Sequence, residues 1–365
     1  NSTTKSMIEP CTNATISIYQ KCLENLLPIP SKLHYIFKFR NIVRVLKGIL
    51  LLNPESIASE SSFIKLWFHE MMREFHDKFN SHEDRHWFRK NLSETCSKFF
   101  KTTIESLAGK GVIMFNEFAD TSQRYKEVTA TQEQILQTCN ATLEEHNKDA
   151  PKPIDIVLFQ EAIHHLSSLS RVLALQRGHA LLVGVKSSGR KSLARLALHM
   201  SSIDPFEIAI TRSYVEWRED IKNLLKQCGV QDIPTGFIIT DTQIIMNQQL
   251  EDLSNLLINC TIPMLFERDE MEAIKAELAS SDPQTDIDYG KYFYQKVLKN
   301  LHIILVFSPY GTIFKDSMLS FPQLRNETTI DWYMPWSQNA LESVAVASLN
   351  KSLQHELVKP ITGAC

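Results

Sequence analysis

The sequence predicts an α/β fold in which a parallel sheet is flanked by helices and preceded by an all-α block. Apolar residues recur at helical spacing through most of residues 1–110. From Ile154 onward, short apolar strands alternate with helical segments. A loop of small residues, bracketed by Gly184 and Gly189, joins the first strand to the next helix. A parallel sheet with helices between its strands accounts for this alternation.

The all-α block is predicted over residues 1–110. Pro28 and Pro30 end its first helix, and Pro54 follows its second, because proline cannot continue a helix. Its helices are expected at about 15–27, 40–52, 63–80 and 86–106. A linker with a polar helix near 132–147 is expected over 111–150, the α/β core over 151–350, and a truncated C-terminal end over 351–365.

Within the core, the apolar runs that predict strands lie at 180–183, 206–210, 237–240 and 301–307. Helices are expected between them at 192–199, 217–227 and 249–259. This alternation of strand and helix is typical of a phosphate-binding α/β core.

Composition argues against several classes of protein, namely nucleic-acid-binding, membrane-spanning and disulfide-rich secreted proteins. A net charge of −3 over 365 residues favours neither nucleic acid nor an anionic membrane as a partner. No apolar run has the length of a membrane span. The 7 cysteines are odd in number and widely spaced, which indicates a reducing compartment rather than a disulfide framework or a zinc site. The polar N-terminus lacks a start methionine and a signal pattern, so we expect a piece of a longer, cytoplasmic protein.

The loop after the strand at 180–183 is the sharpest local motif. Backbone N–H groups in such a loop converge on phosphate oxygens at the start of a helix. The usual pattern, GxxxxGK[ST], would place lysine at 190 and a hydroxyl at 191, but the chain has Arg190, Lys191 and Ser192. A guanidinium pairs well with phosphate, whereas the hydroxyl that binds magnesium is displaced by about 100° around the helix.

The residues predicted to contact phosphate are Gly184, Val185, Lys186, Ser187, Ser188, Gly189, Arg190, Lys191 and Ser192. Taken alone, this segment fits an ordinary strand, turn and helix equally well.

A second element favours nucleotide binding. The apolar strand at 237–240 ends at Asp241, which is placed to orient magnesium or its water shell. In ATPases with this arrangement a glutamate normally follows and acts as the base, but here Thr242 follows. Ser308 ends the strand at 301–307 and is a candidate contact to the γ-phosphate. The candidate metal ligands are Asp241 and, more weakly, Ser192, and no catalytic base is predicted.

Several ordered blocks resemble one known family, the axonemal dynein heavy chains. The blocks that resemble the fourth AAA+ module are Val157-Leu158-Phe159, Glu161-Ala162-Ile163-His164-His165, Arg177-Gly178-His179, Thr240-Asp241-Thr242-Gln243-Ile244, Leu250-Glu251-Asp252-Leu253, Ser308-Pro309-Tyr310-Gly311 and Thr329-Ile330-Asp331-Trp332. Those that resemble the helical lid of the third module are Leu26-Leu27-Pro28, His34-Tyr35 and Leu66-Trp67-Phe68-His69-Glu70. Together they cover nearly the whole chain.

The resemblance implies a fold, ligands and partners. It implies a P-loop AAA+ core after a helical lid, with ATP or ADP as ligand; the displaced Ser192 makes Mg²⁺ binding possible but weakened. It further implies contact with other dynein AAA+ modules and dynein chains, contact with microtubules only through parts absent here, and location in the cytoskeleton of a ciliary axoneme. Lys186 and Ser187 stand where the family usually has glycine, and Lys315 is a poor substitute for arginines that act on the preceding module.

We therefore expect a degenerate AAA+ module that binds nucleotide and hydrolyses little or none. One alternative is a self-sufficient P-loop NTPase, which would need the missing base and metal hydroxyl. Another is an interaction fragment that binds no nucleotide and only packs against partners.

Overall fold

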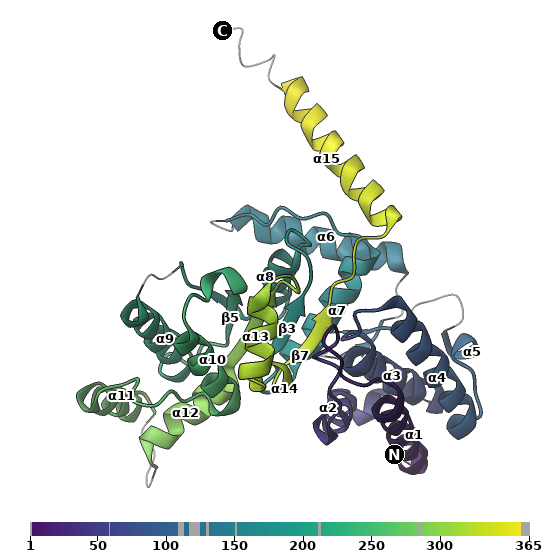
Figure 1. The fold of residues 1–365 in the computed structure, drawn as a ribbon, viewed down its shortest axis with the longest axis horizontal. Helices are drawn as coiled ribbons and strands as arrows, with labels where there is room; N and C mark the ends of the chain where they lie inside the picture. Colours follow the sequence, from purple (N-terminus) through teal and green to yellow (C-terminus); the bar gives the residue numbers. More distant parts are fainter. Residues whose placement is uncertain are drawn as a thin grey trace.

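The computed structural model describes residues 2–57, 59–108, 113–116, 125–128, 131–149, 152–210, 213–282 and 287–358. These form a helical unit, an α/β core beside it, and a C-terminal helix that projects away from both (Figure 1). Parts of the expected linker at 111–150 and the last residues of the expected C-terminal end, 359–365, lie outside the described residues. In the described part, no helix combines the length and apolarity of a membrane span.

The helical unit contains helices near the expected segments, but its first helix begins at Ser2, not near residue 15, and contains Pro10. Ser59 and Ser81 begin two of its helices, and each side-chain oxygen accepts a hydrogen bond from a backbone N–H in the first turn. The segment after Met71 widens into one turn of π-helix, all of it buried. In chain order the elements are α1 (Ser2–Asn25), α2 (Phe39–Ile49), η1 (Pro54–Ser56), α3 (Glu60–Met71), η2 (Met72–His76), α4 (His82–Phe100) and α5 (Ile104–Ala108).

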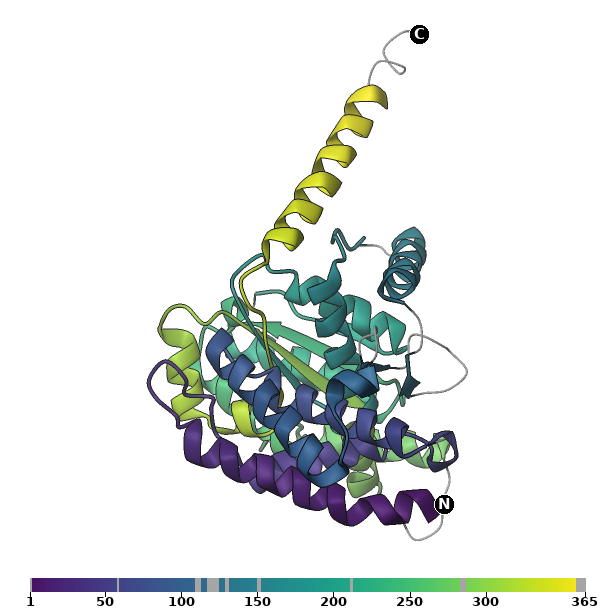
Figure 2. The same cartoon turned by 90° about the vertical axis from the view of Figure 1, so that its right-hand side faces the viewer.

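Aromatic side chains fill the core of the helical unit. Trp67, Phe75, Phe79 and Phe88 have no exposed surface, and Trp67 Nε1 donates to Thr15 Oγ1 at 2.9 Å. A short antiparallel pair, β1 (Phe115–Asn116) and β2 (Lys126–Glu127), adds to the same core. Figure 2 shows the helices of this unit lying in front of the sheet.

The α/β core contains a 5-stranded parallel sheet in the order β4-β5-β6-β3-β7. Strand β6 lies between β5 and β3, although it follows both in sequence. The carboxyl ends of these strands therefore meet along one edge. The strands are β3 (Ala180–Val183), β4 (Asp204–Glu207), β5 (Thr235–Thr240), β6 (Leu301–Phe307) and β7 (Thr329–Trp332).

Helices cover both faces of the sheet, because alternate strand residues point to opposite sides. Leu182 and Ile304 face one cluster with α6 (Gln132–Asp149), α7 (Gln160–Ala174) and α8 (Arg190–Met200). Leu181 and Leu305 face a second cluster. The helices of that second cluster are α9 (Tyr214–Gly229), α10 (Asn247–Asn259), α11 (Arg268–Ser281), α12 (Tyr289–Asn300), α13 (Thr312–Ser320) and α14 (Gln323–Asn326). The chain then enters α15 (Gln338–Val358), which projects outward in both views.

The fold class expected from the sequence is confirmed: a helical block precedes a parallel sheet flanked by helices. Strands β3 and β6 occupy the predicted residues, while β4 lies at Asp204–Glu207, slightly before the predicted 206–210. Alternation in the sequence does not predict β7, because Thr329–Trp332 mixes polar and apolar residues and all four are buried. Tertiary packing, not local pattern, makes it a strand.

Candidate functional site

The glycine-bracketed loop crosses the carboxyl end of β3 and leads into α8. Ser187 and Gly189 have φ angles of 64° and 78°, in the left-handed region. A Cβ on Gly184 would lie 2.7 Å from Tyr333 Cβ, so only glycine fits there. The N–H of Gly184 donates to Phe307 O at 3.2 Å. The loop is therefore fixed against the end of β6 as well as β3.

The side chain of Arg190 lies inside this loop and stabilises it by hydrogen bonds. Its buried side chain donates from Nη2 to Val185 O at 2.9 Å and from Nη1 to Phe307 O. Burial lowers the pKa of Arg190, and the Asp241 carboxylate opposes that shift. The guanidinium therefore holds the loop to β6 and brings positive charge near Asp241.

Lys191 turns away from the loop. Its Nζ lies 2.7 Å from Glu207 Oε2 on the edge strand β4, and Arg195 Nη2 donates to the same carboxylate oxygen at 2.8 Å. Ser192 is half-buried in the first turn of α8. In this structure the basic residue in the loop's interior is Arg190, one position before Lys191.

Asp241 and Ser308 lie together at the ends of two neighbouring strands. The N–H of Ser308 donates to Asp241 Oδ2 at 2.8 Å. Ser308 directly follows Phe307, whose carbonyl accepts from Gly184 and Arg190. The end of β6 thus joins the loop to Asp241 through consecutive residues, although these groups are far apart in sequence.

Thr242 does not supply a base. It is exposed, and its Oγ1 lies 2.9 Å from Thr240 Oγ1 in a hydroxyl–hydroxyl hydrogen bond. A hydroxyl paired with a second hydroxyl is a poor base near neutral pH. Within the described ranges, no three His, Cys, Asp or Glu side chains gather as a metal site.

A cavity of about 400 Å³ opens beside the loop and is bounded by both units of the chain. The core side is lined by loop residues 187–189, by residues 155–157 and Phe159, and by the chain after β7. Two hydroxyls on this side, Ser188 Oγ and Tyr333 OH, are buried and have no hydrogen-bond partner among the described residues. Buried hydroxyls are almost always paired in native proteins, so these two are suited to a polar ligand.

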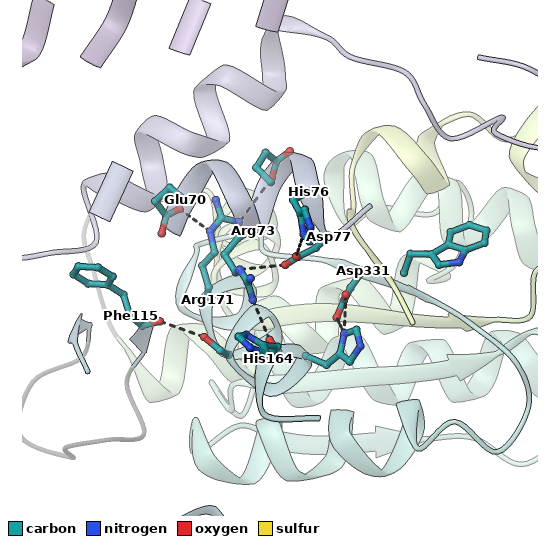
Figure 3. A network of polar contacts seen from close by, with 12 residues as sticks. Glu70, Arg73, His76, Asp77, Phe115, His164, Arg171 and Asp331 are labelled. Carbon is teal, nitrogen blue, oxygen red and sulfur yellow. Dashed lines mark hydrogen bonds and ion pairs between the residues drawn. The ribbon is translucent and has the colours of Figure 1, made fainter. Parts of the chain in front are cut away.

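A buried polar network joins the helical unit to the core (Figure 3). Arg171 on α7 donates from Nε to Glu70 Oε2 at 2.6 Å, and neither side chain has exposed surface. Arg171 Nη2 also donates to Arg44 O at 3.2 Å, and Tyr125 donates to Glu70 Oε1 at 2.6 Å. Burial lowers the pKa of Arg171, but the Glu70 and Glu74 carboxylates outweigh it and raise that pKa. Arg171 therefore keeps its positive charge inside the protein.

The network continues toward the cavity. Arg73 Nη1 donates to His164 O at 3.1 Å and its Nε lies 3.1 Å from Asp77 Oδ2. His165 Nδ1 lies 2.9 Å from both oxygens of Asp331. Burial lowers the pKa of His164 to about 4. The helical unit therefore holds the part of α7 that borders the cavity.

Gly48 makes room for this network. A Cβ there would lie 1.6 Å from Glu70 Oε2, and that carboxylate is held by Arg171. We expect Gly48→Ala to displace Glu70 and lower the free energy of unfolding by about 2–4 kcal/mol, measured by urea denaturation. Gly290→Ala, in the first turn of α12, is the control and changes stability by less than about 1 kcal/mol. Equal effects of the two variants would contradict this account.

The sequence singles out the loop, Asp241 and Ser308, and the structure brings all three to the end of β6. The sequence does not single out Tyr333 or the cavity wall supplied by the helical unit. Tyr333 follows β7 directly, and β7 pairs with β3. Its place beside the loop follows only from that pairing, which local sequence does not reveal.

Comparisons with known proteins identify the family of both the helical unit and the α/β core. The family described as "P-loop containing dynein motor region D4" matches residues 154–365, and that described as "AAA+ lid domain" matches residues 11–108. The chain is 36% identical over 357 residues to human "Dynein axonemal heavy chain 6", covering 94% of this chain. It is also 36% identical over 359 residues to "Dynein-1-beta heavy chain, flagellar inner arm I1 complex" of Chlamydomonas reinhardtii.

The chain spans only 8% of the length of these relatives. The match nevertheless includes the helical unit, the phosphate-type loop and the strand ends around β6. This chain belongs to the dynein heavy-chain family, and its α/β core is a P-loop-containing dynein motor region D4.

Proposed function

We propose that the α/β core binds ATP or ADP at the loop between Gly184 and Ser192 and hydrolyses it little or not at all. The observation that carries this proposal is the convergence at the end of β6. Phe307 O accepts from the loop and from Arg190, and the next residue donates to Asp241. The loop's backbone would hold phosphates, and the Arg190 guanidinium would add positive charge beside them. Ser188 and Tyr333 offer hydroxyls that have no hydrogen-bond partner within the described ranges.

Magnesium binding is weak in this proposal. Asp241 Oδ2 already accepts from Ser308, and Ser192 is one residue beyond the usual hydroxyl position. Magnesium prefers near-octahedral oxygen ligands, which here would come from Asp241, Ser192, water and the nucleotide. Such an ion would neutralise phosphate charge.

In the longer heavy chain, the module would act structurally or as a regulator of ATP-dependent movement along microtubules. The relatives are named as axonemal and flagellar heavy chains, which supports a role in cilia. The partners would be other AAA+ modules and dynein chains, and microtubules would be reached through other parts of the heavy chain. The location would be the axoneme.

Nucleotide binding is tested with Gly189→Val. Gly189 has a φ of 78°, and an added Cβ would lie 3.2 Å from Ile156 Cδ1, so valine distorts the loop. We expect isothermal titration calorimetry to show binding of ADP by the unmodified chain and at least about tenfold weaker binding by the variant.

Gly311→Val is the matched control, since Gly311 also has a positive φ, 88°, but nothing lies within 4 Å of an added Cβ. It should keep the affinity for ADP even if it lowers the melting temperature. If the unmodified chain binds neither ADP nor ATP, the interaction-fragment alternative replaces this proposal.

Because threonine, not glutamate, follows Asp241, we expect negligible turnover. Phosphate release from ATP should be the same for the unmodified chain and for Asp241→Asn, because Thr242 cannot polarise water. A malachite-green assay over several hours measures it. Release by the unmodified chain well above that of Asp241→Asn would instead support the self-sufficient NTPase.

A further inference from the structure

The cavity beside the loop has a wall that belongs to the helical unit. This wall consists of Met72, Arg73, His76, Asp77, Arg85 and Arg89, on η2, α4 and the turn between them. It faces the core residues that line the same cavity. A ligand in this cavity would therefore contact both units.

Most charged groups on the wall are already engaged by protein atoms. Arg73 contacts Asp77 and the carbonyl of His164. Arg85 donates from Nε to Phe79 O at 2.9 Å and from Nη2 to Trp332 O at 2.8 Å. These two arginines hold the units together and have little left to offer a ligand.

Arg89 differs from both. It donates one hydrogen bond, from Nε to His76 Nε2 at 3.0 Å. In the described part of the chain its terminal nitrogens, Nη1 and Nη2, have no hydrogen-bond partner, and the residue is exposed where it lines the cavity. A guanidinium held at one nitrogen and open at the other two is oriented and available.

The opposite wall has the complementary chemistry. Ile156, Phe159 and Trp336 provide apolar surface, and the ring of Trp336 lies 5.8 Å from that of Phe159. The buried hydroxyls of Ser188 and Tyr333 lie near the loop. A flat aromatic base fits between apolar side chains and a guanidinium, which stacks on or donates to such rings. Phosphates, in contrast, would lie on the loop at the start of α8.

We propose that Arg89, from the helical unit, binds the nucleoside part of the nucleotide whose phosphates lie on the loop of the core. The helical unit and the core then share one ligand, and binding strengthens the contact between them. This inference rests on the proposed nucleotide binding. It assigns a residue outside the α/β core to that site.

The test separates base recognition from phosphate recognition by comparing ADP with inorganic tripolyphosphate in calorimetric titrations. Arg89→Ala should weaken ADP binding about fivefold to tenfold and leave tripolyphosphate binding unchanged. Gly189→Val should weaken both ligands. Lys90→Ala is the matched control, since Lys90 is exposed on the same helix and lies outside the cavity lining.

Other results would contradict either the role of Arg89 or nucleotide binding itself. If Arg89→Ala leaves ADP affinity unchanged, or weakens both ligands equally, Arg89 does not recognise the nucleoside and the inference is wrong. If the unmodified chain binds neither ligand, the proposed nucleotide site itself fails. Arg89→Lys, which keeps the charge without the planar group, should fall between the unmodified chain and Arg89→Ala for ADP alone.

Discussion

Replacing Arg171 with methionine should lower the free energy of unfolding by about 3–5 kcal/mol, because it leaves a buried carboxylate without its partner. Arg171 and Glu70 have no exposed surface and lie 2.6 Å apart. A second carboxylate, Glu74, lies 3.7 Å from Arg171 Nη1. Methionine fills much of the volume but offers no donor, so among the described residues Glu70 keeps only Tyr125 as a hydrogen-bond donor.

Urea denaturation followed by tryptophan fluorescence measures this effect. Arg268→Met, at an exposed position on α11, is the control and should change stability by less than about 0.5 kcal/mol. Adding Glu70→Leu to Arg171→Met should recover part of the loss, because the unpaired charge is then removed as well. If Arg171→Met costs less than about 1 kcal/mol, the network is not what joins the units.

Acidification from pH 7.5 to 5.5 should also destabilise the protein strongly. Burial lowers the pKa of His34 and His179 to about 3, and of His76 and His164 to about 4. Each imidazole is neutral in the folded chain but gains a proton when unfolded below about pH 6.5. Above pH 6.5 these histidines therefore do not lower the free energy of unfolding. As the pH falls from 6.5 toward their pKa in the folded chain, the free energy of unfolding decreases.

Between pH 6.5 and 5.5 each such histidine lowers the free energy of unfolding by about 1 kcal/mol. Melting temperatures at pH 7.5, 6.5 and 5.5 measure the sum. His164→Gln should reduce the slope, while His82→Gln, at an exposed position, should leave it unchanged. A melting temperature that is constant over this range would show that the buried histidines do not control acid stability.

The sequence predicts local elements well where one physical rule acts over a few neighbouring residues. The buried strand at 301–307 is an apolar run interrupted only by His302, and the observed β6 has the same bounds. Glycines 184 and 189 bracket a loop at the start of a helix, and the structure gives Gly189 the left-handed φ that glycine tolerates. The break between helices near Pro28 and Pro30 agrees with the exclusion of proline from helix interiors, although α1 itself contains Pro10.

The partners of charged side chains are harder to predict. Arg190 and Lys191 are adjacent in sequence, yet Arg190 lies inside the loop and Lys191 on Glu207 of the edge strand. Both have the charge that a phosphate site needs. Their directions differ because neighbouring residues on a helix point about 100° apart, and the choice of partner depends on which strand lies beside each face.

The sequence by itself determined the helical block, the parallel α/β core, the phosphate-type loop and the aspartate at a strand end. Each depends on periodicity or on the conformational range of a few residues. Only the tertiary structure placed β6 between β5 and β3, Tyr333 under the loop, and Arg89 at the cavity. These placements join residues far apart in sequence, such as Glu70 and Arg171, because long-range pairing depends on how whole elements pack.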